Sequence, residues 1–140
     1  MATTLTAERR GKPELRFSYR DPNQRNDNVG LGLSTYGPYD KTISGRPKTC
    51  DFGFVYPSSW EALAKEFKGR FLDGYEWLRE GFKEFFKLDD VGFKMYPVEL
   101  TEEGYKKGIE EVLEGDHDIA LVLVSEDMKL QELGPYWLSK

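Results

Sequence analysis

Residues 119–124, with the sequence IALVLV, form an uninterrupted run of six apolar residues. A strand that is apolar at every position is typical of a parallel sheet with helices on both sides, because neither face of the strand then meets water. The run therefore predicts a buried parallel strand. The neighbouring segments are interpreted outward from it.

A helix is predicted over residues 102–114, immediately before the run. Thr101 is suited to cap its first turn, and Gly115 is suited to end it. The spacing of three and four predicts one inward face, made of Tyr105, Ile109, Val112 and Leu113. The charged residues of this helix are predicted to form a solvated, salt-bridged surface: Lys106, Lys107, Glu110, Glu111 and Glu114.

Two further strands are predicted upstream of that helix. In residues 49–56 (TCDFGFVY), every second residue is a large aromatic or a cysteine, which is the alternation of a strand with one apolar side. Cys50 belongs to that side, so we interpret it as a small buried residue rather than a nucleophile. Residues 91–100 (VGFKMYPVEL) predict the next strand.

Two helices are predicted between these strands. The first covers about residues 60–68, with Ser58 or Ser59 as its N-cap and Gly69 as a break. The second is predicted from the strongest helical period in the chain, for which a buried face is favoured over a cofactor-stacking surface. That period consists of Phe71, Tyr75, Leu78, Phe82 and Phe85.

The N-terminal part has weaker patterns. Residues 1–14 are predicted to be a loose polar tail, and residues 15–19 (LRFSY) alternate like a strand. Residues 29–40 (VGLGLSTYGPYD) are rich in glycine and contain a proline, which permit and fix tight backbone paths.

Together these segments predict a single α/β domain over residues 15–140. The expected architecture is a doubly wound, Rossmann-like, mostly parallel sheet with helices on both faces. In such sheets ligands lie beyond the carboxyl ends of the strands. A binding site is therefore expected in the segment that follows residue 124.

The composition limits the kinds of site that this segment can hold. Among 140 residues there is one cysteine and one histidine, which excludes an internal disulfide and disfavours zinc sites and Ser-His-Asp triads. His117 stands between two aspartates and is predicted to be a solvated loop residue. No metal and no cofactor are expected.

Charge and hydropathy point to further exclusions. The net charge of −5 argues against a broad nucleic-acid-binding face, but it leaves room for a local phosphate pocket. No apolar stretch is long enough to cross a membrane, and the polar N-terminus lacks the pattern of a signal peptide. A cytoplasmic location is the resulting expectation.

The best candidates for such a pocket are Tyr136 and Lys140. If a helix begins at Pro135, they share one face, four residues apart, within its first turns. A helix N-terminus and a lysine both suit a phosphate, and a tyrosine ring can stack on a base. Glu126 and Asp127 are the alternative, as metal ligands or a catalytic acid, against a loop that only caps the next turn.

Several of these stretches, in this order, resemble the MID domain of prokaryotic Argonautes (PIWI superfamily), which binds the 5′ end of a guide strand. The similar stretches are LRFSY at 15–19, GLSTYGPYD at 32–40 and PYWLSK at 135–140. Between them lie a Phe-rich helix pair, a strand, a helix and an apolar strand, in the same order as in that family. PYWLSK is similar to the Tyr-x-x-x-Lys part of the family's 5′-phosphate pocket.

The resemblance implies that Tyr136 stacks on the first base of a guide DNA or RNA and that Lys140 binds its 5′ phosphate. In that family a glutamine and a second lysine follow, and a PIWI half carries the acidic nuclease residues. The sequence stops at Lys140, before any of these. We therefore expect a non-catalytic chain, truncated at the Tyr-x-x-x-Lys motif, that is part of a larger or split Argonaute.

Two other functions are weighed against this one. The second hypothesis is a protein–protein interaction module of the same fold that docks on a PIWI-containing partner chain, which the acidic charge also favours. The third is a small enzyme that uses Glu126 or Asp127 in a crevice, and it is the least favoured.

Overall fold

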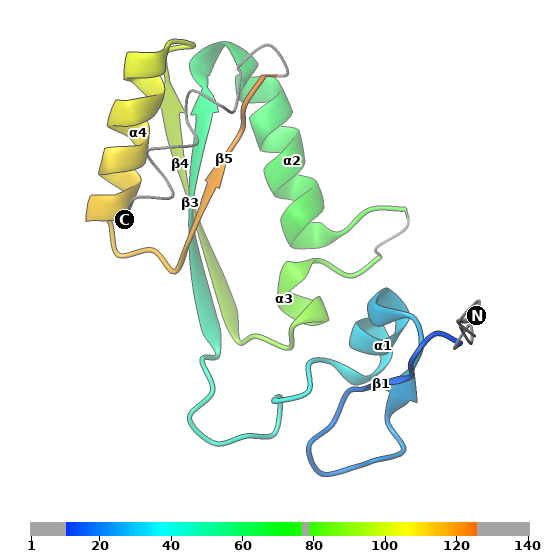
Figure 1. Cartoon of the computed structure of the whole chain (residues 1–140). Coiled ribbons are helices and arrows are strands. Elements are labelled where there is room, and N and C mark those ends of the chain that lie inside the picture. The colour runs from blue at the N-terminus through cyan, green and yellow to red at the C-terminus, as the bar shows by residue number, and fades with distance from the viewer. Residues whose placement is uncertain (1–10, 77–78, 126–140) are drawn as a thin grey trace, which may run out of the picture.

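A three-stranded parallel sheet forms the centre of the molecule in a computed structural model (Figure 1), which describes residues 11–76 and 79–125. Its strands are β3 (Thr49–Pro57), β4 (Asp90–Val98) and β5 (Ile119–Val122). The order is β4-β3-β5, so the first of the three strands in the chain is the middle one. Phe54 is level with Met95 on one side and with Leu121 on the other. The three strands predicted for this region are confirmed.

Helices cover both faces of the sheet. A 3-10 turn, η1 (Ser58–Trp60), leads into α2 (Glu61–Asp73), and α4 (Glu102–Glu114) connects β4 to β5. Alternate residues of β3 point to the two helices, since Phe54 and Tyr56 cluster with Ala64 of α2, whereas Val55 clusters with residues of α4. Figure 1 shows the sheet between the two helices. The molecule is therefore a mixed α/β fold.

Helix α4 has the bounds that its sequence predicts. The Thr101 hydroxyl accepts a hydrogen bond from the Gly104 N–H at 3.0 Å, and Tyr105, Ile109 and Val112 are buried. Leu113 was expected to point inward, but it is 61% exposed. Each helical residue is rotated by about 100° from the one before, so the residue after Val112 leaves the narrow buried stripe.

The helices between β3 and β4 differ from the prediction. Helix α2 runs through Gly69 to Asp73 and ends at Gly74, whose φ is 90°. A helical glycine costs only about 1 kcal/mol relative to alanine, and stacked rings of Phe67 and Phe71 hold the helix on both sides of it. The cap predicted from Ser58 or Ser59 is absent, because Trp60 occupies the N-cap position without a side-chain hydrogen bond.

The predicted second helix of this pair is also wrong. Of its described residues, Phe71 belongs to the end of α2, and the separate short helix α3 covers Phe82–Phe85. The aromatic residues nevertheless form the buried cluster that their spacing suggested. Phe71 and Phe82 stack at 4.8 Å between centroids, and both rings approach Phe52 of β3, at 5.1 and 5.0 Å. Tyr75 is 48% exposed, and Leu78 lies outside the described residues.

The N-terminal part forms a small layer of its own. Strands β1 (Leu15–Arg16) and β2 (Arg25–Asn26) pair antiparallel, so the predicted strand over 15–19 is confirmed only in its first two residues. The Gly-rich stretch, expected to be an irregular path, forms helix α1 (Val29–Tyr36), which Asn28 caps. Gly37, with φ 76°, ends it.

This layer packs against the amino end of the sheet. The Arg46 guanidinium donates to the Phe86 carbonyl at 2.5 Å, and the Asp89 N–H donates to the Lys48 carbonyl at 2.7 Å. In Figure 1 the layer lies below the sheet, at the end opposite to the N-termini of α2 and α4.

Strand β5 is less covered than its sequence predicts. Leu121 packs on the α2 side and Val122 on the α4 side, but Ile119 is 40% exposed. The reason is its place in the sheet, because among the described residues no strand pairs with its outer edge. No helix within residues 11–76 and 79–125 has the length and apolar character needed to cross a membrane.

Candidate functional site at the carboxyl edge of the sheet

The three parallel strands end at one edge of the sheet, the upper edge in Figure 1. Helices α2 and α4 both begin at this edge, since each follows a strand that ends there. It is the edge at which ligands bind in parallel α/β sheets. The chain leaves β5 at the same place, so residues that follow residue 124 start from it.

Two buried hydrogen bonds hold the exit from β5. The Leu123 N–H donates to the Val55 carbonyl at 2.9 Å, which extends the pairing of the two strands by one residue. The Tyr105 hydroxyl donates to the Leu123 carbonyl at 2.7 Å. Tyr105 is fully buried, and this burial raises the pKa of its hydroxyl, so the hydroxyl remains a donor. Helix α4 thereby fixes the direction in which the chain leaves the sheet.

The residues predicted to bind a guide strand, Tyr136 and Lys140, lie outside the described part of the chain, as do Glu126 and Asp127. Their roles stay predictions. Of the segment singled out from the sequence, the structure describes only its start, Ser125, which is half-buried.

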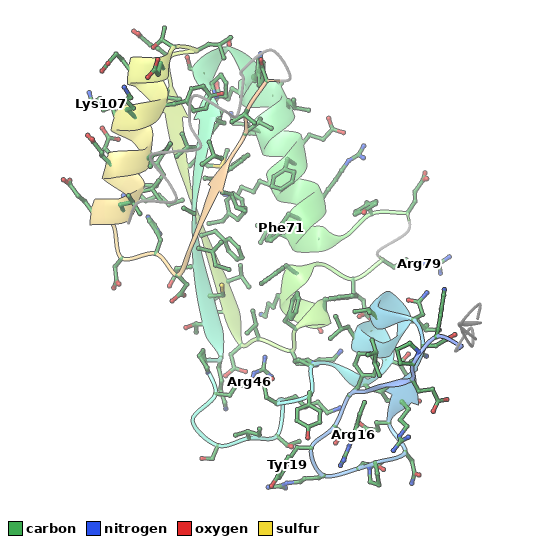
Figure 2. All side chains as sticks on the ribbon, viewed as in Figure 1. Arg16, Tyr19, Arg46, Phe71, Arg79 and Lys107 are labelled. Atoms are coloured by element: carbon green, nitrogen blue, oxygen red, sulfur yellow. The ribbon has the colours of Figure 1, made fainter. Side chains whose placement is uncertain are left out.

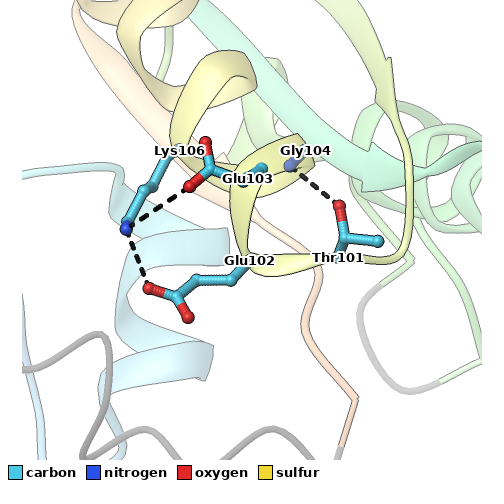
Figure 3. Close-up of polar contacts among 5 residues, drawn as sticks. All are labelled: Thr101, Glu102, Glu103, Gly104 and Lys106. Carbon is cyan, nitrogen blue, oxygen red and sulfur yellow. Dashed lines mark hydrogen bonds and ion pairs between the residues drawn. The ribbon is translucent and has the colours of Figure 1, made fainter.

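Charges at the described part of this edge are largely paired. Figure 3 shows the first turn of α4, where the Lys106 ammonium contacts Glu102 at 2.8 Å and Glu103 at 4.0 Å. In α2, Lys65 contacts Glu61 at 2.7 Å. These glutamates place negative charge next to the N-termini of both helices, where the helix dipole is positive. An anion bound at this edge therefore needs its positive charge from residues beyond the described ones.

The charged surface predicted for α4 is solvated, since Lys107, Glu110, Glu111 and Glu114 are exposed. Lys106 forms ion pairs with Glu102 and Glu103 in the first turn, which the sequence analysis did not name. A glutamate placed four residues before a lysine is the better orientation on a helix, and this geometry selects Glu102.

A groove of about 430 Å³ lies beside the first turns of α4. Its charged lining residues are Glu99, Glu103, Lys107 and Glu111. Three carboxylates against one ammonium make this groove a poor place for a phosphate. The groove therefore does not substitute for the predicted pocket.

His117 is not the solvated loop residue that its neighbours suggested. It is half-buried, and its Nε2 lies 2.7 Å from the Tyr96 hydroxyl. Two glycines make room for the ring, because a Cβ on Gly53 or Gly115 would lie 2.9 or 2.8 Å from its Cδ2. The sequence did carry one sign of this contact, namely a glycine inside an aromatic strand, which often marks a close approach. His117 precedes β5, so it is far from the carboxyl edge.

Cys50 is half-buried near the start of β3. Burial raises the pKa of its thiol, and the Asp118 and Asp51 carboxylates raise it further. Both effects oppose formation of the thiolate, which is the nucleophilic form. This agrees with the interpretation of Cys50 as a non-catalytic residue.

A group of exposed side chains that the sequence analysis missed lies in the N-terminal layer (Figure 2). We call Arg16, Tyr19 and Tyr39 the tyrosine cluster. The two rings meet edge to face at 6.2 Å, and the Arg16 guanidinium lies 5.9 Å from the centre of the Tyr39 ring. The three residues are up to 23 positions apart in sequence, and no periodicity connects them.

No protein-family model matches the sequence, and no curated protein matches it. The resemblance to Argonaute MID domains therefore stays a prediction.

Proposed function

We propose that this chain is a non-catalytic nucleic-acid-binding module of the Argonaute MID type, which anchors the 5′-phosphorylated end of a guide strand within a larger or split Argonaute. The proposal includes the finer architecture, a doubly wound, Rossmann-like sheet. It assigns Tyr136 to stack on the first base and Lys140 to bind the 5′ phosphate.

One observation carries the proposal. The segment that contains both residues follows a strand of a parallel sheet and leaves it at the carboxyl edge, where Tyr105 fixes its direction. This is the edge at which phosphate-bearing ligands meet helix N-termini in α/β folds. In the proposal, a helix that begins at Pro135 supplies N–H groups and Lys140 supplies the positive charge that the described edge lacks.

The test compares two single strands of the same sequence, one with a 5′ phosphate and one with a 5′ hydroxyl. We expect the phosphorylated strand to bind about tenfold more tightly, since one charge-assisted contact of this kind is worth about 1.5–3 kcal/mol. Lys140→Ala should abolish the preference for the phosphate. Tyr136→Ala should weaken binding of both strands, because stacking does not depend on the phosphate. Fluorescence anisotropy measures both effects.

Matched controls exist among the exposed residues of the described part. Tyr75→Ala and Lys107→Ala remove the same groups elsewhere and should leave the affinities unchanged. Equal binding of the two strands, or a preference that survives Lys140→Ala, would show that the proposed function is wrong.

The exposed edge of β5 favours a second candidate, an interaction module that docks on a PIWI-containing chain. Strand β5 is apolar at every position, as a central strand would be, yet among the described residues it lies at the edge of the sheet. Exposed edges of this kind can pair with a strand of another chain. Ile119→Glu should then prevent a complex that the unaltered chain forms with a PIWI-containing partner, as measured by light scattering after size exclusion. Leu113→Glu, which alters an even more exposed apolar residue but on α4, should not. A chain that forms no complex with that partner would contradict this candidate.

A further inference from the structure

Hydrogen bonds tie the backbone beneath the tyrosine cluster, whose side chains are exposed. Tyr19 is 60% exposed and Tyr39 is 43% exposed. Their backbones are joined by a hydrogen bond from the Tyr19 N–H to the Tyr39 carbonyl at 3.2 Å. The Arg16 guanidinium donates to the carbonyls of Ser18 and Tyr19, each at 2.7 Å. The backbone that carries the two exposed rings is thus tied by hydrogen bonds, so less ordering of this backbone is needed when a ligand binds to the rings.

The part of the chain that carries this cluster is rich in cations. Arg16, Arg20 and Arg25 have no carboxylate within ion-pair distance among the residues that the structure describes. Residues 11–48 contain seven lysines and arginines against four acidic residues. Asp40 is paired with Arg46, and one oxygen of Asp21 accepts a hydrogen bond from the Asn23 N–H. This end of the molecule therefore attracts anions.

The region of α4 has the opposite charge. Residues 99–118 contain eight acidic residues and two lysines. The net charge of −5 is therefore unevenly distributed, with an excess of cations in residues 11–48 and an excess of acidic residues in residues 99–118. A polyanion that approaches such a molecule is steered towards the cationic end.

We propose that the tyrosine cluster and Arg20 form a binding surface for the body of a single-stranded nucleic acid. Bases stack on Tyr19 and Tyr39, and phosphates contact Arg16 and Arg20. This inference rests on the proposed function only in that both take a single-stranded nucleic acid as the ligand. The surface lies at the opposite end of the sheet from the carboxyl edge, and it does not involve the 5′ end of the strand.

Single strands fit this surface better than other polyanions do. Their unstacked bases offer flat faces to aromatic rings, whereas a duplex keeps its bases stacked inside. An acidic peptide offers the charge, but its carboxylates would be repelled by the electron-rich faces of the two rings. Binding by an acidic polymer at this surface is therefore an outcome that the experiment must detect.

The experiment measures anisotropy of a labelled 5′-hydroxyl single strand of about 12 nucleotides, a length within the range of such sites, with the full chain. Tyr19→Leu and Tyr39→Leu keep an apolar side chain but remove the flat ring. Each should weaken binding roughly tenfold, in the lower part of the range for one stacked base, because leucine keeps some apolar contact. Arg20→Gln should reduce the slope of log affinity against log salt by about 0.7.

The controls are Tyr75→Leu and Lys107→Gln, which make the same changes elsewhere on the surface and should leave affinity and slope unchanged. Thermal melting checks that each variant is folded. If Tyr39→Leu does not fold, the more exposed Tyr19 and Arg20 still carry the test.

Three results would overturn the inference. The first is an unchanged affinity in folded Tyr19→Leu and Arg20→Gln. The second is equal weakening by the control variants, and the third is full displacement of the strand by polyglutamate at an equal concentration of charge. If the chain shows no preference for the 5′ phosphate but the Tyr19, Tyr39 and Arg20 variants change binding as expected, only the proposed function is contradicted. If the preference is present but these variants bind like the unaltered chain, only this inference is contradicted.

Discussion

The Tyr105 hydroxyl is a single group on which the exit from the sheet depends. It belongs to a fully buried side chain and donates to the carbonyl of the half-buried Leu123. Tyr105→Phe keeps the ring but leaves that carbonyl without its partner, which should lower the free energy of unfolding by about 1–2 kcal/mol. Urea unfolding measures the change. Tyr19→Phe, which removes an exposed hydroxyl, should change it by less than about 0.5 kcal/mol.

The same residue predicts a pH dependence. Burial raises the pKa of Tyr105, so the folded chain keeps this proton at a pH at which the unfolded chain has lost it. The stabilising effect is therefore complete below the usual tyrosine pKa of about 10, and it is lost as the pH rises through the folded-state pKa. Unfolding experiments between neutral and alkaline pH should show a smaller loss of stability for Tyr105→Phe than for the unaltered chain. An identical loss would contradict this role.

At the scale of elements, α1 depends on a glycine for packing rather than for flexibility. A Cβ on Gly32 would lie 2.2 Å from the ring of Phe17, which is itself buried beneath the helix. Gly32→Ala should therefore lower the free energy of unfolding by about 1–3 kcal/mol, the usual cost of overpacking. Thermal or urea unfolding measures it.

Gly30 provides the control in the same helix. A Cβ there would meet only the Asn28 side chain, at an ordinary 3.4 Å. Gly30→Ala should be neutral or stabilise the protein by up to about 1 kcal/mol, because alanine favours the helix. Equal effects of the two substitutions would show that Gly32 does not act through Phe17.

The elements also show where sequence patterns succeed. Helix α4 was predictable because its cap, its apolar spacing and its final glycine all agree. Helix α1 was not, because its glycines favour loops locally, and the reason for one of them, Gly32, is its close contact with Phe17. The helices after β3 were predicted wrongly for a similar reason. The spacing of Phe71 and Phe82 is helical, but Phe71 belongs to α2 and Phe82 to α3, and both rings pack against Phe52 of β3.

At the scale of the whole molecule, Arg46 joins the N-terminal layer to the rest. Its guanidinium is nearly buried and donates to the Phe86 carbonyl at the end of α3. Arg46→Ala should lower the free energy of unfolding by about 1.5–3 kcal/mol, the usual worth of a hydrogen bond from a charged group. It should also speed hydrogen exchange in α1 more than in β3, because the layer loses one of its hydrogen bonds to the segment around α3.

Arg70→Ala is the matched control. Its partner Glu66 lies on the same helix at 2.6 Å, and both side chains are exposed. Exposed pairs of this kind contribute about 0.3–0.5 kcal/mol, so this variant should be nearly as stable as the unaltered chain. Uniform exchange across the molecule in Arg46→Ala would contradict the idea that it links two layers.

The candidate site also combines features that the sequence predicts with features that only the structure shows. Sequence alone places Tyr136 and Lys140 after a buried strand, and the structure adds the edge from which their segment departs. The contact of His117 with Tyr96 was missed, since 21 residues separate them and the flanking aspartates suggest a loop, and its one sign in the sequence is Gly53 inside an aromatic strand. The tyrosine cluster is equally hidden in the sequence, because folding alone brings Tyr39 beside Arg16.

The sequence by itself determined the α/β class, the three parallel strands and the bounds of α4. These features follow from the apolar alternation, caps and breaks of neighbouring residues, which are local and therefore visible in a linear pattern. Only the tertiary structure decided which strand stands at the edge among the described residues, where α2 ends, why Gly32 and Gly53 are glycines, and that Arg16 lies beside the exposed Tyr39. Those features depend on contacts between residues far apart in the chain, which form when the layers pack.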